Sequence, residues 1–273
     1  MKLTHIYNKV ALFAVAALSL TACNDVDEED RFIYVEPPQT SKNVLIEDYT
    51  GQNCTNCPEA TTLIHEIQTQ YGEDRVIAVG IYGGDLGRGL PLATETGEYY
   101  YQKYGISSQP CGMIDRSAKV TGTSGGIGTW LTPVSEAIAN SAPLEMSAVT
   151  SYDEATRTVT VDVTTSGVLD VTGKLQLWLV EDNVVNIQAT NSGVDRRYVH
   201  NHVFRTAVNG QDGEDITIAW DESKTVTNTY TLDEDWKAED MSVVAFVYND
   251  SGVQQVIKVP VIPSDDAETP VEE

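Results

Sequence analysis

The stretch VLIEDYTGQNCTNCP, residues 44–58, joins an apolar run to two cysteines, Cys54 and Cys57, that lie one helical turn apart. The run at 44–49 predicts a buried strand. A helix is predicted over 58–71, because apolar residues recur there at helical spacing and a proline is accepted in a first helical turn. A cysteine pair between a strand and a helix is a redox pair, part of a metal site or a structural disulfide.

The N-terminal residues predict export and lipid attachment. Lys2 and Lys9 precede the apolar run at 10–20, which is too short to span a bilayer but typical of an export signal. The letters LTAC at its end match a lipobox, so we expect a signal peptide at 1–22 and lipidation of Cys23. Several acyl chains on one cysteine anchor a protein stably, since each buried methylene contributes about 0.8 kcal/mol. No signal for inner-membrane retention follows, so we expect the outer membrane.

The charge of the chain excludes one class of partner. The formal net charge is −24, from 17 Lys and Arg against 41 Asp and Glu. Nucleic-acid binding relies on Lys and Arg against phosphate, so we expect no nucleic-acid partner. Residues 23–41 contain the run NDVDEED and predict a solvated tether, and residues 264–273 predict an acidic disordered tail. The acidic run also resembles the signal that sends some lipoproteins to the cell surface.

The chain has two halves of different pattern. Within residues 42–141, predicted strands alternate with predicted helices, which favours an α/β layer. The pattern predicts further strands at 75–82 and from 112 to 115. It also predicts helices at 94–104 and 129–140, the second with Pro133 in its first turn.

Residues 142–263 lack the helical period and predict a second domain. They contain β-rich runs that are separated by Gly, Asn and Asp turn residues. Such spacing predicts an all-β sandwich of immunoglobulin-like type, so the predicted fold class is α/β plus all-β. The runs lie at 156–165, 174–182, 198–208, 215–220, 225–232, 242–250 and 254–262.

The position of the cysteine pair has a chemical rationale. The free N–H groups and the partial positive charge at a helix N-terminus favour the thiolate of Cys54. Cys57, one turn further along, is then placed to resolve a mixed disulfide formed by Cys54. This chemistry requires sulfurs that cap the helix and lie partly open to solvent, and we expect that arrangement.

Two segments resemble the thioredoxin fold. IEDYTGQNCTNC, residues 46–57, resembles its active-site segment, and ISSQPCGMID, residues 106–115, resembles its cis-proline segment. The resemblance covers about residues 42–140 and implies a thioredoxin-like domain. It implies that Asp48 is the buried acid that exchanges a proton with the resolving cysteine. It also implies that Pro110 follows a cis peptide bond and faces the two cysteines, which completes the catalytic set.

The segment departs from that family at three places. Asn53 stands where the family usually has Trp, and Thr55-Asn56 separate the cysteines. Cys111 follows the proline directly and would add a third thiol near the pair.

Two alternatives to redox chemistry therefore stay open. A soft metal such as Zn²⁺ or Cu(I) could be bound by Cys54, Cys57 and Cys111, whereas His65 lies too far along the helix to be a fourth ligand. A permanent disulfide is the other alternative, although so short a loop gains little entropic stabilisation. We expect no cofactor.

A histidine pair in the second half is a candidate metal site. In YVHNHVFR, residues 198–205, His200 and His202 lie two apart in a predicted strand and should share one face. No third ligand is evident nearby, and strand histidines are more often exposed or hydrogen-bonded, so we favour an ordinary structural role.

Taken together, the lipobox, the run CTNCP and the β-rich half with YVHNHVFR resemble the twenty-eight-kilodalton outer-membrane lipoprotein family, which is described as containing adhesins and receptors. We expect a lipid-anchored outer-membrane protein that performs thiol–disulfide exchange on exported proteins, with Cys54 attacking a substrate disulfide and Cys57 resolving the intermediate. The alternative is a non-enzymatic surface adhesin or ligand-binding lipoprotein that uses the fold as a scaffold.

Overall fold

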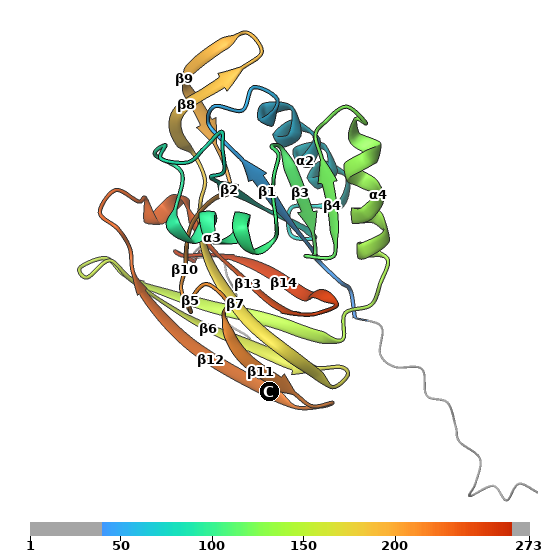
Figure 1. The fold of residues 1–273 in the computed structure, drawn as a ribbon. Coiled ribbons are helices and arrows are strands. Elements are labelled where there is room, and N and C mark those ends of the chain that lie inside the picture. Colours follow the sequence, from blue (N-terminus) through green and yellow to red (C-terminus); the bar gives the residue numbers. More distant parts are fainter. Residues whose placement is uncertain (1–39, 264–273) are drawn as a thin grey trace, which may run out of the picture. The chain divides into compact units, whose positions relative to one another are not determined.

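The computed structural model describes residues 40–263, and its fold is mixed α/β with more strand than helix (Figure 1). The predicted signal peptide, Cys23, the tether up to residue 39 and the predicted tail at 264–273 lie outside the described residues. Within 40–263, no helix is long and apolar enough to cross a membrane.

The first part of the described chain confirms the strand and helix predictions. β1 and β2 pair in parallel, and β3 is antiparallel to β1. Both central strands are buried along their whole length, because each of their faces packs on a hydrophobic core. The elements are β1 (Val44–Thr50), α2 (Cys57–Tyr71), β2 (Val76–Tyr82), α3 (Glu95–Lys103), β3 (Cys111–Ile114) and β4 (Ala118–Thr121).

The helix that closes this part corrects one prediction. α4 (Ile127–Ile138) begins two residues earlier than expected, so Pro133 lies in its interior and not in its first turn. A proline there removes one backbone hydrogen bond. Trp130 and Val134 of α4 are fully buried against α2 and the sheet, and this packing holds the helix in place despite the proline.

The second part of the chain forms two packed β layers. A three-stranded sheet of β12, β6 and β5 packs against β7, β11 and β13 through alternating apolar residues. The sequence prediction missed β5 and β8 and joined β9 to β10. The strands are β5 (Leu144–Asp153), β6 (Thr158–Gly167), β7 (Val171–Glu181), β8 (Val184–Thr190), β9 (Gly193–His200), β10 (Val203–Ala207), β11 (Glu214–Ile218), β12 (Ser223–Thr231), β13 (Met241–Asn249) and β14 (Gly252–Pro260), with a 3-10 turn at Ala238–Asp240.

One sheet crosses from the first part to the second. Its strand order is β14-β13-β7-β10-β2-β1-β3-β4, and β11 also pairs with β7. The crossing point is short: Val203 of β10 aligns in parallel with Gly80 of β2, whose amide donates to the carbonyl oxygen of His202 at 2.7 Å. A Cβ at Gly80 would lie 3.3 Å from the Tyr82 ring, so a glycine suits this close approach.

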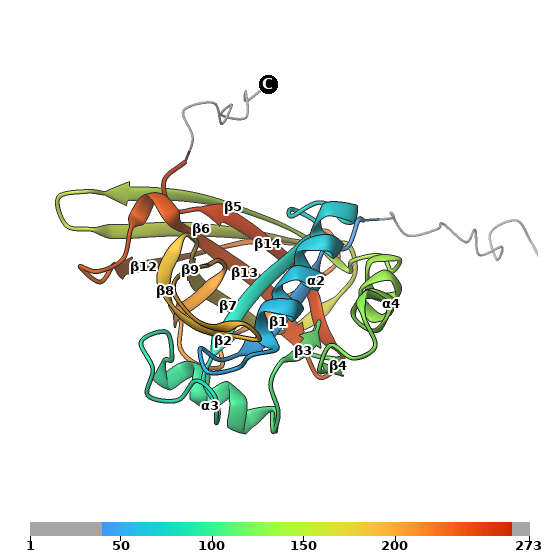
Figure 2. The ribbon, with the colours of Figure 1, turned by 90° about the horizontal axis from the view of Figure 1, so that it is seen from above.

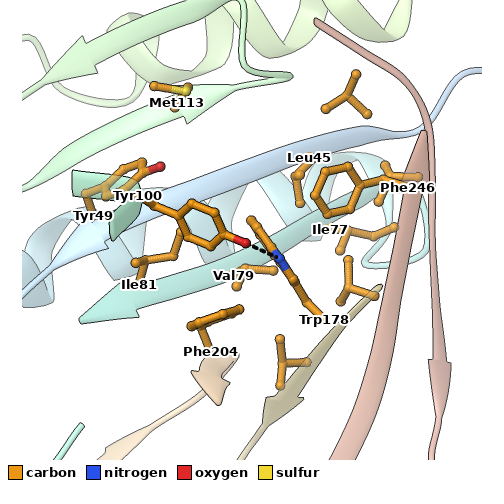
Figure 3. Close-up of a cluster of buried hydrophobic side chains, with 14 of the residues drawn as sticks. Leu45, Tyr49, Ile77, Val79, Ile81, Tyr100, Met113, Trp178, Phe204 and Phe246 are labelled. Carbon is orange, nitrogen blue, oxygen red and sulfur yellow. Dashed lines mark hydrogen bonds between the residues drawn. The ribbon is translucent and has the colours of Figure 1, made fainter. Parts of the chain in front are cut away.

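Side chains from both parts form one hydrophobic core. Trp178 of β7, Phe204 of β10 and Phe246 of β13 lie against Tyr100 of α3 and the apolar side chains of β1 and β2 (Figure 3). The indole nitrogen of Trp178 donates to the hydroxyl of Tyr100 at 3.0 Å, which satisfies a polar atom that burial would otherwise penalise. Unfolding either part would therefore expose aromatic surface of the other.

A buried ion pair lies beside this core. Arg116, in the turn between β3 and β4, contacts Glu47 of β1 at 2.8 Å, and their side chains are 3% and 0% exposed. The Arg116 guanidinium carbon also lies 4.2 Å from the centroid of the Tyr248 ring on β13. The pair therefore ties the first part of the sheet to the second through charge and through a cation–π contact.

Loss of Arg116 should destabilise the whole fold. We expect Arg116→Ala to lower the free energy of unfolding by about 3–5 kcal/mol, because it leaves the Glu47 carboxylate buried without its partner. Urea denaturation measures the change. The matched control is Lys174→Ala, which breaks the exposed Lys174–Asp215 pair and should leave stability nearly unchanged. Equal losses of unfolding free energy in Arg116→Ala and Lys174→Ala would contradict this account.

Candidate functional site

The loop between β1 and α2 holds the cysteine pair at the start of the helix. Cys57 is the first residue of α2, and Pro58 follows where its missing N–H has no intrahelical partner to lose. Cys54 lies in the preceding turn, where its amide donates to the carbonyl oxygen of Gly51 at 3.0 Å. The two sulfurs are joined in a disulfide, so the pair is in its oxidised state.

The structure brings Pro110 and Cys111 to the same end of β1. The Gln109–Pro110 peptide bond is cis, as expected from the sequence, and Cys111 begins β3 directly opposite Tyr49. The side-chain nitrogen of Gln109 donates to the carbonyl oxygen of Thr50, the last residue of β1. The proline segment is thus held beside the strand end from which the cysteine loop emerges.

Cys111 is a poor nucleophile in this setting. The thiol is 3% exposed, and burial raises its pKa, which disfavours the thiolate that attack or metal binding requires. Within residues 40–263, no group of three or more His, Cys, Asp and Glu side chains is placed to hold a metal ion. Because Cys54 and Cys57 are bonded to each other, the metal alternative gains no support from this geometry.

Asp48 is the perturbed acid of the site. It lies on β1 with its side chain on the α2 side of the sheet and is 6% exposed. Burial raises its pKa from 3.8 to about 7, and its Oδ1 atom has no hydrogen-bond partner among the described residues. A carboxyl group with this pKa can accept or release a proton at neutral pH, as the resemblance to the thioredoxin fold implied.

A cavity of about 320 Å³ borders Asp48. Ala78 and Gly80 of β2 line it. Its wall comes from α2 on one side and from β9 with the two residues after it on the other. The other lining residues are Thr61, Thr62, Ile64, His65, Gln68, Tyr82, Tyr198, Val199, His200, Asn201 and His202.

The expectation of solvent-accessible sulfurs is wrong. Cys54 and Cys57 are each 2% exposed, so neither is open to a partner in this state. An element of the second half binds the loop that carries Cys54. The hairpin of β8 and β9 lies beside the loop between β1 and α2 (Figures 1 and 2).

Hydrogen bonds hold this hairpin to the cysteine loop. The side-chain nitrogen of Gln188 donates to the carbonyl oxygen of Cys54 at 2.9 Å and to that of Gly51 at 3.2 Å. The amide of Ala189 donates to the carbonyl oxygen of Gln52 at 2.7 Å. In the other direction, the side-chain nitrogen of Gln52 donates to Asn186 Oδ1 and to the carbonyl oxygen of Ile187, each at 3.0 Å.

The two histidines do not lie in one strand. His200 ends β9, is 1% exposed and shares a hydrogen bond of 2.8 Å between its Nδ1 and the hydroxyl of Tyr82. Burial lowers its pKa to about 4, so it is neutral at pH 7. His202 lies beyond the strand with a left-handed φ of 56° and contacts Asp182 at 3.0 Å. The prediction failed because the strand ends between the two residues.

Sequence reasoning missed Gln52 and Gln188, which join the hairpin to the cysteine loop. The hairpin itself was detectable, since two valine-containing runs flank the turn Asn191-Ser192-Gly193. Its docking site was not, because Gln188 and Cys54 are 134 residues apart in sequence.

Comparison with known proteins gives a family. A sequence model of the family "Outer membrane protein Omp28" matches residues 97–264. Among solved structures, HBP35 of Porphyromonas gingivalis is similar, with 20% identity, a TM-score of 0.69, and coverage of 86% of this chain and 79% of that chain. A domain of the outer membrane lipoprotein Omp28 from the same organism has 28% identity and a TM-score of 0.33 over 44% of this chain and 88% of its own. None of the curated proteins compared with the chain matches it.

The match covers more than half of the chain, so the class is that of outer membrane proteins. The chain belongs to the Omp28 family and is located at the outer membrane, as the sequence predicted. The likeness to HBP35, at this level of identity, concerns the fold.

The raised pKa of Asp48 should appear in the pH dependence of stability. Between pH 4 and 7 the unfolded chain loses this proton while the folded chain keeps it, so folding stability falls as pH rises. Asp48→Asn cannot ionise. Above pH 7 it should therefore be more stable than the wild type by up to about 4 kcal/mol, a gain that disappears below pH 4. Urea denaturation of both oxidised proteins at several pH values tests this. If the stabilities of the wild type and Asp48→Asn change with pH in the same way, the raised pKa of Asp48 is contradicted.

Proposed function

We propose that the protein is a thiol–disulfide exchange protein of the outer membrane. In this proposal residues 42–141 are a thioredoxin-like domain and residues 142–263 an immunoglobulin-like sandwich. The observation that carries the proposal is the arrangement around the disulfide: Cys57 starts α2, the raised-pKa carboxyl group of Asp48 lies on the α2 side of β1, and the cis Gln109–Pro110 bond lies at the end of β1.

The proposed exchange proceeds in two steps. In the reduced protein, the Cys54 thiolate attacks one sulfur of a substrate disulfide, which forms a mixed disulfide and releases one substrate thiolate. Cys57 then attacks the Cys54 sulfur, which frees the second substrate thiolate and restores the Cys54–Cys57 disulfide. Asp48 accepts the proton that Cys57 loses on becoming a thiolate. The substrate is thereby reduced by two electrons and the protein is oxidised by two, and the same steps run in reverse when the substrate brings a dithiol.

The partners follow from the location. Exported proteins with exposed thiols or disulfides are the proposed substrates, and the lipid on Cys23 is the proposed membrane contact. Pro110 would shape the surface on which a substrate segment lies beside the cysteines. Cys111 has no step in this scheme, in keeping with its burial and its raised pKa.

A second function is favoured by the burial of the sulfurs. With each cysteine 2% exposed, the described fold also suits a non-enzymatic adhesin or ligand-binding lipoprotein whose disulfide is structural. The hairpin beside the cysteines presents Val185, Val194 and Val199 to solvent, with exposed fractions of 57%, 65% and 49%, which would serve as contact surface.

Trapping of the mixed disulfide separates the two functions. The full chain with Cys57→Ser is reduced and mixed with a peptide that contains one disulfide, and the adduct is located by mass spectrometry. We expect an adduct on Cys54, because the resolving thiol is absent. Cys54→Ser should form no adduct on Cys57 at a comparable rate, and Cys111→Ser should exchange like the wild type. An absence of adduct on Cys54 would favour the adhesin.

A further inference from the structure

Access to sulfur limits any chemistry at this site. A thiolate attacks a disulfide at one of its sulfurs, so the rate depends on how often a sulfur is reachable. Cys54 and Cys57 are each 2% exposed. If the pair exchanges as proposed above, part of the structure must move first, and the following inference rests on that proposed function.

The neighbouring elements differ in how firmly they are held. β1, β3 and α2 contribute fully buried side chains to two hydrophobic cores, so moving any of them would expose apolar surface. The β8–β9 hairpin is a separate two-stranded sheet, and among the described residues its strands pair with each other and with no third strand. Three of its valines face solvent already, and Val184 is its one described residue that packs against a hydrophobic cluster, so displacing it would expose little additional apolar area.

The contacts of the hairpin fall into two groups. Its base is fixed: His200 is bonded to Tyr82, and the amide of Asn183 donates to Asn201 Oδ1 at 2.9 Å. The half nearer the tip is held to the cysteine loop by polar contacts, in which Gln188 binds the carbonyl oxygens of Cys54 and Gly51. A hairpin that is fixed at its base and held by hydrogen bonds toward its tip can swing away without unfolding the core.

We propose that the β8–β9 hairpin is a displaceable cover that controls the reactivity of the Cys54–Cys57 disulfide. Gln188 is the residue that holds it closed, with help from Asn186, which accepts a hydrogen bond from Gln52. The closed state protects the disulfide, and the open state exposes Cys54 to a partner. Control of the thiol chemistry then belongs to the second half of the chain, from which the hairpin projects.

The cover is tested by the rate of reduction of the wild-type chain and its variants by dithiothreitol. Two thiols of the reagent become its cyclic disulfide, and the protein disulfide becomes two thiols, which are alkylated and counted on the peptide that contains Cys54 and Cys57. Gln188→Ala removes two hydrogen bonds to the loop and should raise the rate at least about tenfold. Asn186→Ala is milder, because Asn186 is only half-buried, and should raise the rate severalfold without loss of fold.

Two controls separate local opening from other effects. Val194→Ala lies on the same hairpin with its side chain in solvent, and its reduction rate should equal that of the wild type. Arg116→Ala weakens the whole fold without touching the hairpin, and it should be reduced far more slowly than Gln188→Ala. Rates for Gln188→Ala and Asn186→Ala within about twofold of the wild type would overturn the cover, and so would an acceleration by Arg116→Ala as large as that by Gln188→Ala.

The failure of this inference is distinguishable from failure of the proposed function. Faster reduction of Gln188→Ala in a protein that forms no adduct with the disulfide peptide would support the cover and remove the exchange function. If the chain forms the adduct but Gln188→Ala is reduced at the wild-type rate, the exchange function is supported and the cover is overturned.

Discussion

The contact between β2 and β10 is the constraint on which the arrangement of the site depends. It joins the two parts of the main sheet through Gly80 and Val203, with one backbone bond from Gly80 to His202. The segment directly before β10 is the β8–β9 hairpin, and Gln188 and Ala189 of this hairpin donate hydrogen bonds to the cysteine loop that follows β1. The contact between β2 and β10 therefore lies at the base of the hairpin that reaches the cysteine loop.

The core beneath the site makes this topology rigid. Aromatic side chains of β7, β10 and β13 pack with Tyr100 and with β1 and β2, and the buried Arg116–Glu47 pair lies beside them. A buried ion pair is weak evidence for stability but costly to break, so it favours one fixed arrangement of the two parts. Against this fixed frame the hairpin has little apolar attachment, since Val184 is its one described residue that packs against a hydrophobic cluster. Rigid support under the disulfide and a loosely attached hairpin beside it suit the controlled access proposed above.

Local patterns in the sequence predicted the strand before the cysteines and the helix after them. The resemblance to the thioredoxin fold implied the buried acid at Asp48 and the cis bond before Pro110, and both are present. The hydrogen bond from Gln188 to the carbonyl oxygen of Cys54 could not be predicted, because the two residues are 134 positions apart in the chain. The error over the histidine pair had a different cause: a left-handed residue broke a β-rich run that propensity alone would continue.

The central claim is that Cys54 and Cys57 undergo thiol–disulfide exchange with a partner and do not form a purely structural disulfide. Its most direct test is the reduction potential of the pair, obtained by equilibrating the full chain in a series of thiol–disulfide buffers and then alkylating the free thiols. The account predicts a reversible transition between about −270 and −120 mV, the range of known exchange proteins. A potential below about −300 mV, as structural disulfides have, would contradict it.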